Sequence, residues 1–372
     1  MDFDPPPDDD PRRLAVRAWL ADHPAPTPRQ LAEAGYVAPH WPPPWGLGAD
    51  PTEQVLIDEE LERAGVTRPD NPIAVGWAGP TILAGGTPEQ QQRWLPGILD
   101  GTETWCQLFS EPDAGSDLAS LRTRAERDGD DYVVNGQKIW STWANRSDWG
   151  ILLARTDPDA PRHKGISYFV LDMRAPGVEV RKIVEMTGGN HVNETFLQDV
   201  RIPADCRIGP EHEGWRLAKV TLGNERVSLS EGGVLWGMGP TSEACFAHLR
   251  EQGVDHPVLR QRAAAAYTET VVIGLLGHRI MAAIQRDGEP GSFASVRKAL
   301  ADEHGQHLMG LIKDRRGAAG MLGVQDEHAE ERDVWHWGFL FSPALTIGGG
   351  TSEVQRDIIA EHLLGLPREP RP

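Results

Sequence analysis

The amino-acid sequence predicts an α+β protein with an N-terminal helical domain, a middle β domain of barrel or sandwich form and a C-terminal helical bundle. Three observations lead to this fold class. Apolar residues recur with helical spacing in the first hundred residues, β-rich runs fill the stretch from about 105 to 205, and helical spacing returns after Gly214. We therefore expect three domains, at residues 1–104, 105–213 and 214–372.

The N-terminal domain is expected to consist of short helices separated by proline-rich breaks. Helical spacing over residues 14–20 ends at the break 24–28. A second break, 41–48, leads to another helical stretch that begins near Thr52, and residues 88–99 suggest one more short helix.

The middle domain is expected to contain several strands in close succession. Asn135-Gly136 lies between two β-rich runs and predicts a hairpin turn, because both residues of such a turn must accept positive φ. The predicted strands cover residues 102–109, 131–141, 149–154, 166–172, 178–184 and 195–200.

The C-terminal domain is expected to be built from long helices. Helical spacing covers residues 215–252, 257–286, 292–323 and 353–364. Within the first of these, Ala218, Leu222, Glu225 and Leu229 fall on one stripe of the helix, so a carboxylate is embedded in an apolar face.

The bulk composition narrows the class of protein. The chain has 372 residues, of which 39% are hydrophobic and 25% charged, as in ordinary soluble globular proteins. No apolar run approaches the roughly 20 residues that span a bilayer, so we expect no membrane segment. The acidic, proline-rich start does not resemble a signal peptide, which favours a cytoplasmic location. The net charge of −18 argues against nucleic acid as a partner.

No metal site is expected from the cysteines and histidines. Cys106, Cys206 and Cys245 have no short metal-ligand spacing and are expected to be buried thiols in a reducing compartment. His304 and His307 lie about one helical turn apart but lack a third ligand, so they are expected to be surface residues.

Three segments together resemble the acyl-CoA dehydrogenase family: residues 109–117 (FSEPDAGSD), 135–142 (NGQKIWST) and 347–356 (IGGGTSEVQR). Their order and separations fit that family, and the resemblance extends over nearly the whole chain. It implies an acyl-CoA dehydrogenase-like fold, FAD as cofactor, and α,β-dehydrogenation of an acyl thioester to the trans-2-enoyl thioester.

The first segment is a candidate cofactor loop. Gly115 lets the backbone approach an anion closely. The resemblance implies that Ser116 contacts the phosphates of FAD and of the CoA substrate, and that Leu108 and Ser110 lie along the flavin ring. The alternative is that Ser116 belongs to a turn that only ends the strand.

The second segment is a candidate contact with the flavin ring. Trp140 and Thr142 alternate with Ser141 on the predicted strand, so they share one face. The resemblance implies that Trp140 lies against the ring and that Thr142 is within hydrogen-bonding reach of it. Donors at this place stabilise the negative charge that develops on a flavin as it takes a hydride. The alternative for Trp140 is a place in the core.

The third segment is a glycine-rich turn that leads into a helix. Ser352 and Gln355 are expected to form a capping box, and a helix N-terminus preceded by glycines favours an anionic or polar ligand. The resemblance makes Thr351 and Glu353 candidate contacts with FAD. Glu353 could equally be a dipole partner in the first helical turn.

The catalytic base is expected on the helix after Gly214, not in the third segment. Removal of the α-proton needs a nearby carboxylate. Many family members carry this glutamate where the present chain has Gly349. Some carry it instead in a Glu-Arg pair that Glu225-Arg226 matches, and burial would raise the pKa of Glu225 toward a useful range. The Gly349 N–H would polarise the thioester carbonyl, and Arg226 is a candidate substrate contact. A structural ion pair is the alternative for Glu225.

Two other functions remain open at this point. One is a flavin-dependent oxidase or monooxygenase of the same fold, and the other is a non-catalytic subunit of a heteromeric acyl-CoA dehydrogenase. The resemblance implies an acyl-CoA or acyl carrier protein thioester as substrate and electron-transferring flavoprotein as electron acceptor. It also implies a homodimer or homotetramer, and leaves a heteromer open.

Overall fold

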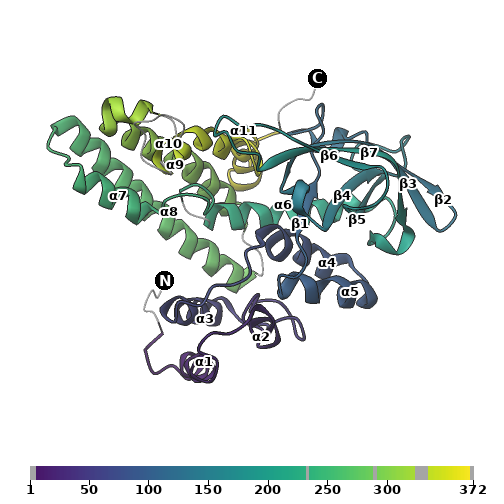
Figure 1. The fold of residues 1–372 in the computed structure, drawn as a ribbon, viewed down its shortest axis with the longest axis horizontal. Helices are drawn as coiled ribbons and strands as arrows, with labels where there is room; N and C mark the ends of the chain where they lie inside the picture. Colours follow the sequence, from purple (N-terminus) through teal and green to yellow (C-terminus); the bar gives the residue numbers. More distant parts are fainter. Residues whose placement is uncertain (1–5, 232–233, 288–290, 323–333, 369–372) are drawn as a thin grey trace. The chain divides into compact units, whose positions relative to one another are not determined.

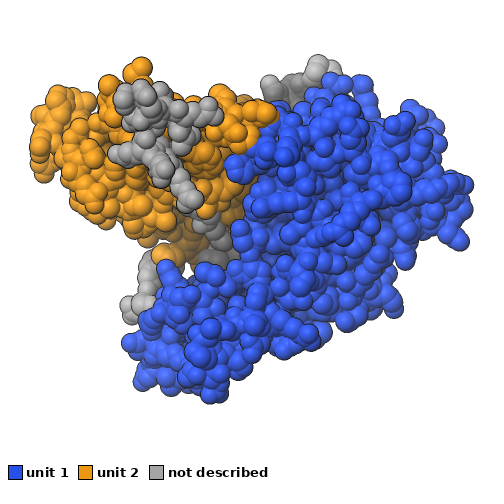
Figure 2. Space-filling view, in the orientation of Figure 1, with its two compact units in different colours: residues 1–183, 190–224 blue, residues 184–189, 225–372 orange. Residues whose placement is uncertain are grey.

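The structure, a computed structural model, describes residues 6–231, 234–287, 291–322 and 334–368. The chain divides into two compact units, coloured separately in Figure 2. Unit 1 comprises residues 1–183 and 190–224, and unit 2 comprises residues 184–189 and 225–372.

The N-terminal part of unit 1 is helical, as the sequence predicted. Four of its helices begin with proline and are preceded by a residue whose side chain accepts a hydrogen bond from the first turn: Asp10, Thr27, Asp50 and Thr87. The bounds are α1 (Pro11–Asp22), α2 (Pro28–Glu33), α3 (Pro51–Arg63), α4 (Gly79–Gly85) and α5 (Pro88–Leu99). Helix α2 was not expected, because its single turn is hidden behind a proline-rich stretch.

A buried carboxylate joins helices α1 and α3. Glu60 of α3 is 2% exposed and accepts hydrogen bonds from Arg13 (2.6 Å), Arg17 (2.7 Å) and Arg63 (2.9 Å). The hydrogen bond from Arg17 lowers the pKa of Glu60, and this effect outweighs burial, which would raise it. The side chain is therefore ionised and shared among three guanidinium groups.

The rest of unit 1 is built on one mixed sheet of eight strands (Figure 1). The strand order is β6-β7-β3-β2-β4-β5-β8, and β1 pairs in parallel with β4. The bounds are β1 (Trp105–Leu108), β2 (Arg124–Asp128), β3 (Asp131–Thr142), β4 (Trp149–Arg155), β5 (Ile166–Asp172), β6 (Val178–Lys182), β7 (Val192–Pro203) and β8 (Arg207–Ile208).

The predicted hairpin at Asn135-Gly136 is wrong. These residues lie inside the continuous strand β3, at a shift of register against β7, and the actual turn joins Asp128 to Asp131. Gly136 is needed for another reason. A Cβ there would lie 2.3 Å from the side-chain oxygen of Thr123, so only glycine permits this close approach.

Long helices follow the sheet, as expected, but with different bounds. The stretch predicted as one helix over 215–252 forms two helices, and α10 was not expected. The helices are α6 (Gly214–Glu231), α7 (Ser242–Glu251), α8 (Pro257–Asp287), α9 (Phe293–Arg316), α10 (Val334–Phe341) and α11 (Ser352–Ile358). Within the described ranges, no helix is both long and apolar enough to cross a membrane.

The core of unit 2 forms where α7, α9 and α10 meet. Its buried members include Cys245, Leu308 and Phe341, and Trp236 and Trp337 pack against it. All three cysteines of the chain are buried free thiols, as predicted, and burial raises their pKa values to about 12 for Cys106, about 11 for Cys206 and about 12 for Cys245.

Candidate active site

Helix α6 and the glycine-rich turn before α11 bring two predicted site residues together. Glu225 is 6% exposed. A Cβ built on Gly349 would lie 3.6 Å from Glu225 Oε1, so the carboxylate lies directly beside the turn. These two residues are more than a hundred positions apart in the chain, and the fold brings the predicted base next to the predicted thioester donor.

Gly349 has no room for a side chain. Its φ of +66° is in the left-handed region, and a Cβ there would lie 2.5 Å from Leu229 Cδ1 and 2.9 Å from Lys298 Cε. A glutamate at this position would need both a strained backbone and displacement of the half-buried Leu229 and the fully buried Lys298. The absence of a carboxylate at 349 is therefore built into the packing around the turn.

A buried ion pair lies beside the same turn. Lys298 is fully buried, and its Nζ donates to Asp302 Oδ2 and, at 3.4 Å, to the carbonyl oxygen of Leu345. Burial raises the pKa of Asp302 to about 6, although Lys298 and Trp236 beside it oppose the rise. This pair was not predicted from the sequence, because Lys and Asp one helical turn apart usually form an exposed surface pair.

Arg226 follows the candidate base on α6 and is half-buried. Burial lowers the pKa of Arg226, and the charge of Glu225 opposes that shift. The guanidinium nevertheless stays charged at neutral pH. Its role toward substrate remains a prediction.

The predicted capping box at the start of α11 is wrong. The N-cap is Thr351, whose hydroxyl oxygen accepts from the Val354 N–H at 3.3 Å. Gln355 is fully buried and donates to the carbonyl oxygens of Gly349 and Gly350, at 3.2 Å each. It holds the glycine-rich turn in place instead of capping the helix.

The two predicted cofactor contacts on α11 differ in what they offer. Thr351 still has its hydroxyl proton to donate, because it only accepts in the cap. Glu353 is exposed, and its carboxylate lies 3.5 Å from Arg356 one turn along the helix. An exposed carboxylate in the first turn is compatible with both interpretations of Glu353 given above.

In unit 1, a buried carboxylate anchors the loop that carries Ser110 and Ser116. Glu111 accepts hydrogen bonds from Lys138 Nζ (2.8 Å), the Arg122 N–H (2.6 Å) and the Thr123 N–H (2.9 Å). Burial raises the pKa of Glu111, but these contacts outweigh it and the net pKa lies below its usual range. Burial lowers the pKa of Lys138 to about 8, against the opposing charge of Glu111.

The tip of this loop is open. Gly115 and Ser116 are exposed, and a Cβ added to Gly115 would meet nothing within 4 Å. Ser110 is half-buried, and its carbonyl accepts from the Ile139 N–H at 2.9 Å. The Leu108 side chain is fully buried, so at this residue only the backbone could reach a cofactor.

Trp140 is an exposed indole on a distorted strand. It is 60% exposed and has a φ of +61°, at a bulge between Lys138 and Ser141. A core position for Trp140 is therefore excluded. The bulge breaks the regular alternation from which a shared face was predicted, but Ser141 is buried while Thr142 is half-buried. A non-glycine residue held at positive φ beside a cofactor loop is typical of a functional site.

The chemistry of these unit 1 residues fits a flavin. An exposed indole offers an apolar face for a ring, the hydroxyl groups of Ser110 and Thr142 offer hydrogen bonds at its edge, and the open Gly115-Ser116 tip suits a phosphate. The predicted cofactor residues thus fall in both units: Leu108, Ser110, Ser116, Trp140 and Thr142 in unit 1, and Thr351 and Glu353 in unit 2.

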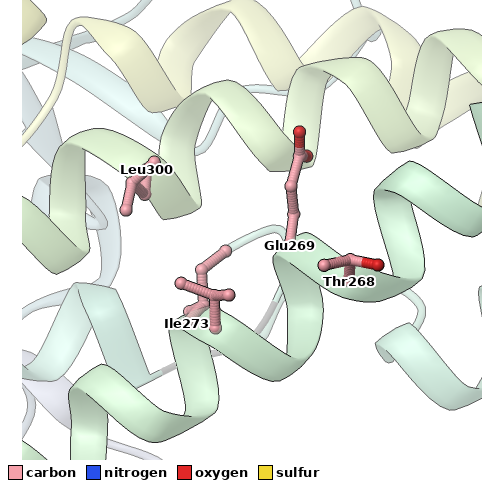
Figure 3. Close-up of a pocket in the computed structure, with 5 residues that line it drawn as sticks. Thr268, Glu269, Ile273 and Leu300 are labelled. Carbon is pink, nitrogen blue, oxygen red and sulfur yellow. The ribbon is translucent and has the colours of Figure 1, made fainter.

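A small pocket on unit 2 is a separate feature (Figure 3). It has a volume of about 100 Å³ and is lined by Thr268, Glu269, Val272 and Ile273 of α8 and Leu300 of α9. Ligand pockets for drug-sized molecules measure about 300–1,000 Å³, so this pocket is too small for FAD or an acyl-CoA.

His304 contacts Glu269, one of the residues that line this pocket, and the expectation that His304 is a surface residue is wrong. It is 4% exposed, and its ring nitrogens lie 2.9 Å from Glu269 Oε2 and 2.9 Å from Thr270 Oγ1. These contacts satisfy a buried imidazole within the α8–α9 packing. The described residues contain no group of three or more His, Cys, Asp or Glu side chains that could hold a metal ion.

Models of one protein family match the chain in three consecutive stretches. These are the acyl-CoA dehydrogenase N-terminal domain over residues 11–102, the middle domain over 106–200 and the C-terminal domain over 212–364. Together they cover most of the sequence, in the order of the helical, sheet and helical segments.

Characterised relatives carry the same family name. Acyl-CoA dehydrogenase FadE34 of Mycobacterium tuberculosis is 44% identical over 91% of this chain, and the chain spans only 46% of FadE34. Acyl-CoA dehydrogenase IpdE1 of the same organism is 39% identical, over 96% of this chain and 97% of IpdE1.

Solved structures with this fold include two-component complexes. The Tcur3481-Tcur3483 steroid ACAD has a TM-score of 0.81 at 32% identity, over 99% of this chain and 100% of the matched chain. The ChsE4-ChsE5 complex from Mycobacterium tuberculosis has a TM-score of 0.79 at 31% identity, over 99% of this chain and 100% of the matched chain.

Proposed function

The chain belongs to the acyl-CoA dehydrogenase family and is an oxidoreductase that acts on acyl-CoA, and from this premise we propose how its own residues carry out the reaction. Glu225 is the catalytic base that removes the α-proton of the acyl thioester. The observation that carries this assignment is the buried position of its carboxylate beside Gly349. There the base can act from α6 on a substrate bound at the glycine-rich turn.

Burial suits Glu225 for this role. A carboxylate out of contact with water binds a proton more readily than a solvated one, so it is a stronger base once substrate has entered. Proton transfer to a positioned carboxylate of this kind contributes about a hundredfold to ten-thousandfold in rate. A position that is costly for folding is thus explained by the chemistry.

Gly349 holds the thioester for that transfer. Its N–H donates to the thioester carbonyl oxygen, where negative charge develops as the α-proton leaves. Positive φ and the absence of a side chain let the turn approach the substrate closely. Arg226 is proposed to contact the substrate from the same helix as the base.

FAD is the proposed cofactor and would supply the acceptor for the hydride that leaves Cβ. In unit 1, Trp140 would pack against the ring, Thr142 and Ser110 would hydrogen-bond at its edge, the Leu108 backbone would lie along it and Ser116 would bind the phosphates. In unit 2, Thr351 would donate to the cofactor and Glu353 would accept from a ribose hydroxyl. The exposure of the Trp140 indole and of the Gly115-Ser116 tip supports this arrangement.

The acyl group is proposed to be bulky and cyclic, carried on CoA. Two relatives support this: the solved steroid ACAD at 32% identity and the cyclohexane-1-carbonyl-CoA dehydrogenase of Geobacter metallireducens at 28%. Electrons leave to an external acceptor such as electron-transferring flavoprotein.

Anaerobic titration with a panel of acyl-CoA thioesters tests this function. Purified yellow protein should bleach with a polycyclic or cyclohexyl acyl-CoA and bleach less with short straight chains. The same acyl groups on acyl carrier protein should act poorly. A panel in which no acyl-CoA bleaches the flavin would contradict the function. Rapid reoxidation of the bleached protein by air would point to an oxidase or monooxygenase instead.

The working particle is proposed to be an oligomer, with a second acyl-CoA dehydrogenase-like chain as the favoured partner. Two of the similar solved structures are complexes of two differently named chains. FadE34 is about twice as long as the part that this chain matches, which leaves room in it for a second such unit. A homodimer or homotetramer is the alternative.

A further inference from the structure

Lys298 is a fully buried cation in unit 2 that has no part in the proposed function so far. It projects from α9 under the glycine-rich turn, where its Cε would lie 2.9 Å from a Cβ on Gly349. Its ammonium bonds to Asp302 and to the Leu345 carbonyl, and lies 5.8 Å from the centre of the Trp236 ring. Lys298 thus packs between the core of unit 2 and the turn.

Burial of this ion pair is costly for folding. Removing two charges from water costs several kcal/mol per ion, and an apolar pair of similar volume is often as stable or more stable. On an exposed face the same Lys and Asp, four residues apart, would pair at little cost. Stability alone therefore gives a weak reason for a lysine at this place.

Lys298 and Glu225 share one neighbourhood. Glu225 Oε1 and Lys298 Cε both lie within 4 Å of the position that a Gly349 Cβ would take. Along the lysine, Cε lies next to the turn, Nζ beyond it, and Asp302 beyond Nζ. The charged groups around Glu225 in the described ranges include Arg226 of its own helix, and Lys298 and Asp302 of α9.

We propose that Lys298 is a positioning residue for α-proton removal: it supports the Gly348–Gly350 turn from below and places a cation beside the Glu225 carboxylate. This inference rests on the proposed role of Glu225 as base. Lys298 touches neither substrate nor cofactor. It keeps the thioester donor at Gly349 and the carboxylate of Glu225 at a fixed spacing, and its charge favours the ionised form of the base.

Removal of the cation should therefore raise the pH at which Glu225 ionises. A neighbouring positive charge stabilises a carboxylate and lowers its pKa, so loss of that charge moves the midpoint upward. Because Asp302 partly cancels the ammonium charge, we expect a shift of roughly half to one pH unit. At pH values below the midpoint, flavin reduction should then slow by roughly threefold to tenfold, and well above the midpoint it should be unchanged, with thioester binding little altered.

The test compares Lys298→Met with the double variant Lys298→Met/Asp302→Asn in the FAD-loaded protein. Methionine keeps the methylene packing under Gly349 and removes the charge. The single variant leaves Asp302 buried without its partner and should unfold at a lower temperature. The double variant removes both charges and should recover that stability. The measurement is the rate of anaerobic flavin reduction by an acyl-CoA substrate across pH 6–9.

Lys313→Met is the matched control. Lys313 lies on the same helix, roughly 22 Å from Lys298 at 1.5 Å per residue. Its ammonium is 5.0 Å from the centre of the Phe339 ring and forms a hydrogen bond with His336 Nδ1. This variant should leave the pH midpoint of flavin reduction where it is in the parent protein.

Recovered stability together with a raised midpoint in the double variant supports a positioning role. A double variant that regains both stability and the parent pH profile shows that Lys298 is only a structural partner of Asp302, and overturns the proposal. If the double variant does not fold, the pH midpoint of flavin reduction is measured on the folded fraction of Lys298→Met. A raised midpoint there supports the proposal, and an unchanged midpoint overturns it. Glu225→Gln, measured in parallel, reports separately on the base: α-proton exchange that persists there would sink the proposed function itself.

Discussion

At the residue scale, the sequence identified the candidate base from two facts that the structure brings together. A glutamate in an apolar helical stripe lacked an explanation, and the usual carboxylate position held Gly349. The structure places Glu225 beside that glycine. Lys298 could not be foreseen in the same way. The i, i+4 spacing of Lys298 and Asp302 shows that they can pair, whereas their burial depends on packing against a turn about fifty residues later.

Gly349→Ala tests whether the turn needs glycine. The added Cβ would lie 2.5 Å from Leu229 Cδ1 at a φ of +66°, so both overpacking and backbone strain act against it. We expect a loss of about 1–4 kcal/mol, seen as a lower thermal midpoint in the apoprotein. The control is Gly310→Ala in α9, where a Cβ meets nothing within 4 Å and helix propensity should stabilise slightly. Equal midpoints for the two variants would contradict the packing described for the turn.

At the scale of single elements, sequence patterns predicted most helices and strands but not their irregularities. Strand β5 and helix α5 have the predicted bounds. The Asn135-Gly136 pair misled because a turn signal inside a long strand cannot be told from a bulge without the partner strand. The N-cap of α11 was assigned to Ser352 instead of Thr351 because both residue types are good N-caps. In the structure Gln355 hydrogen-bonds to the glycine-rich turn, so it is not available for a capping box with Ser352.

Glu60→Gln tests the buried network between α1 and α3. It would leave the buried Arg13, which is 3% exposed, with Glu59 as its remaining carboxylate partner, and we expect a loss of about 2–4 kcal/mol at neutral pH. Glu33→Gln removes an exposed pair with Arg29 and should cost less than about 0.5 kcal/mol. Chemical denaturation of both variants provides the comparison. A Glu60→Gln loss as small as that of the control would show that the network is not stabilising.

The same network predicts how stability depends on pH. The pKa of Glu60 is lowered in the folded protein, so its contribution is present above the unfolded value of about 4.5 and is lost as pH falls through the folded value. The parent protein should therefore lose stability on acidification more steeply than Glu60→Gln. Parallel curves below pH 5 would contradict this expectation.

Glu111→Gln tests the anchor of the cofactor loop. The neutral amide leaves Lys138 buried without a carboxylate partner, which loosens the segment that carries Ser110 and Ser116. We expect the Kd for FAD to rise by at least about tenfold, measured by fluorescence titration of the apoprotein. Glu126→Gln changes an exposed residue of β2 and serves as control. A folded Glu111→Gln protein with unchanged FAD affinity would show that the Glu111–Lys138 pair does not contribute to cofactor binding.

At the scale of the whole molecule, the order of a helical, a β and a second helical segment was predictable, because the period of the hydrophobic residues changes from that of a helix to that of a strand and back. The domain limits at 104/105 and 213/214 remain a proposal. The surface of α8 was not predictable residue by residue. The side chains of this helix with exposed fractions between 42% and 58% include Tyr267, Val271, Val272 and Leu275. The sequence indicates that the helix is rich in apolar residues but not which of them are exposed.

These exposed side chains lead to a prediction about assembly. Apolar groups gathered on one helix usually mark an interface, so the FAD-loaded particle should be larger than a monomer. Val271→Glu/Leu275→Glu should reduce the mass measured by light scattering, and Leu14→Glu, which alters an exposed residue of α1, should not. Co-expression with a second acyl-CoA dehydrogenase-like chain distinguishes a heteromer from a homo-oligomer. A monomeric parent protein with FAD bound would contradict the assembly.

The central claim is that Glu225 removes the α-proton, and Glu225→Gln tests it most directly. Glutamine keeps the shape of the side chain but accepts no proton at neutral pH. The variant should bind FAD and acyl-CoA as the parent does. Flavin reduction should fall by at least about a hundredfold, and exchange of the α-proton with solvent deuterium should be lost in parallel. A Glu225→Gln protein that reduces flavin and exchanges the α-proton at close to the parent rate would contradict the account.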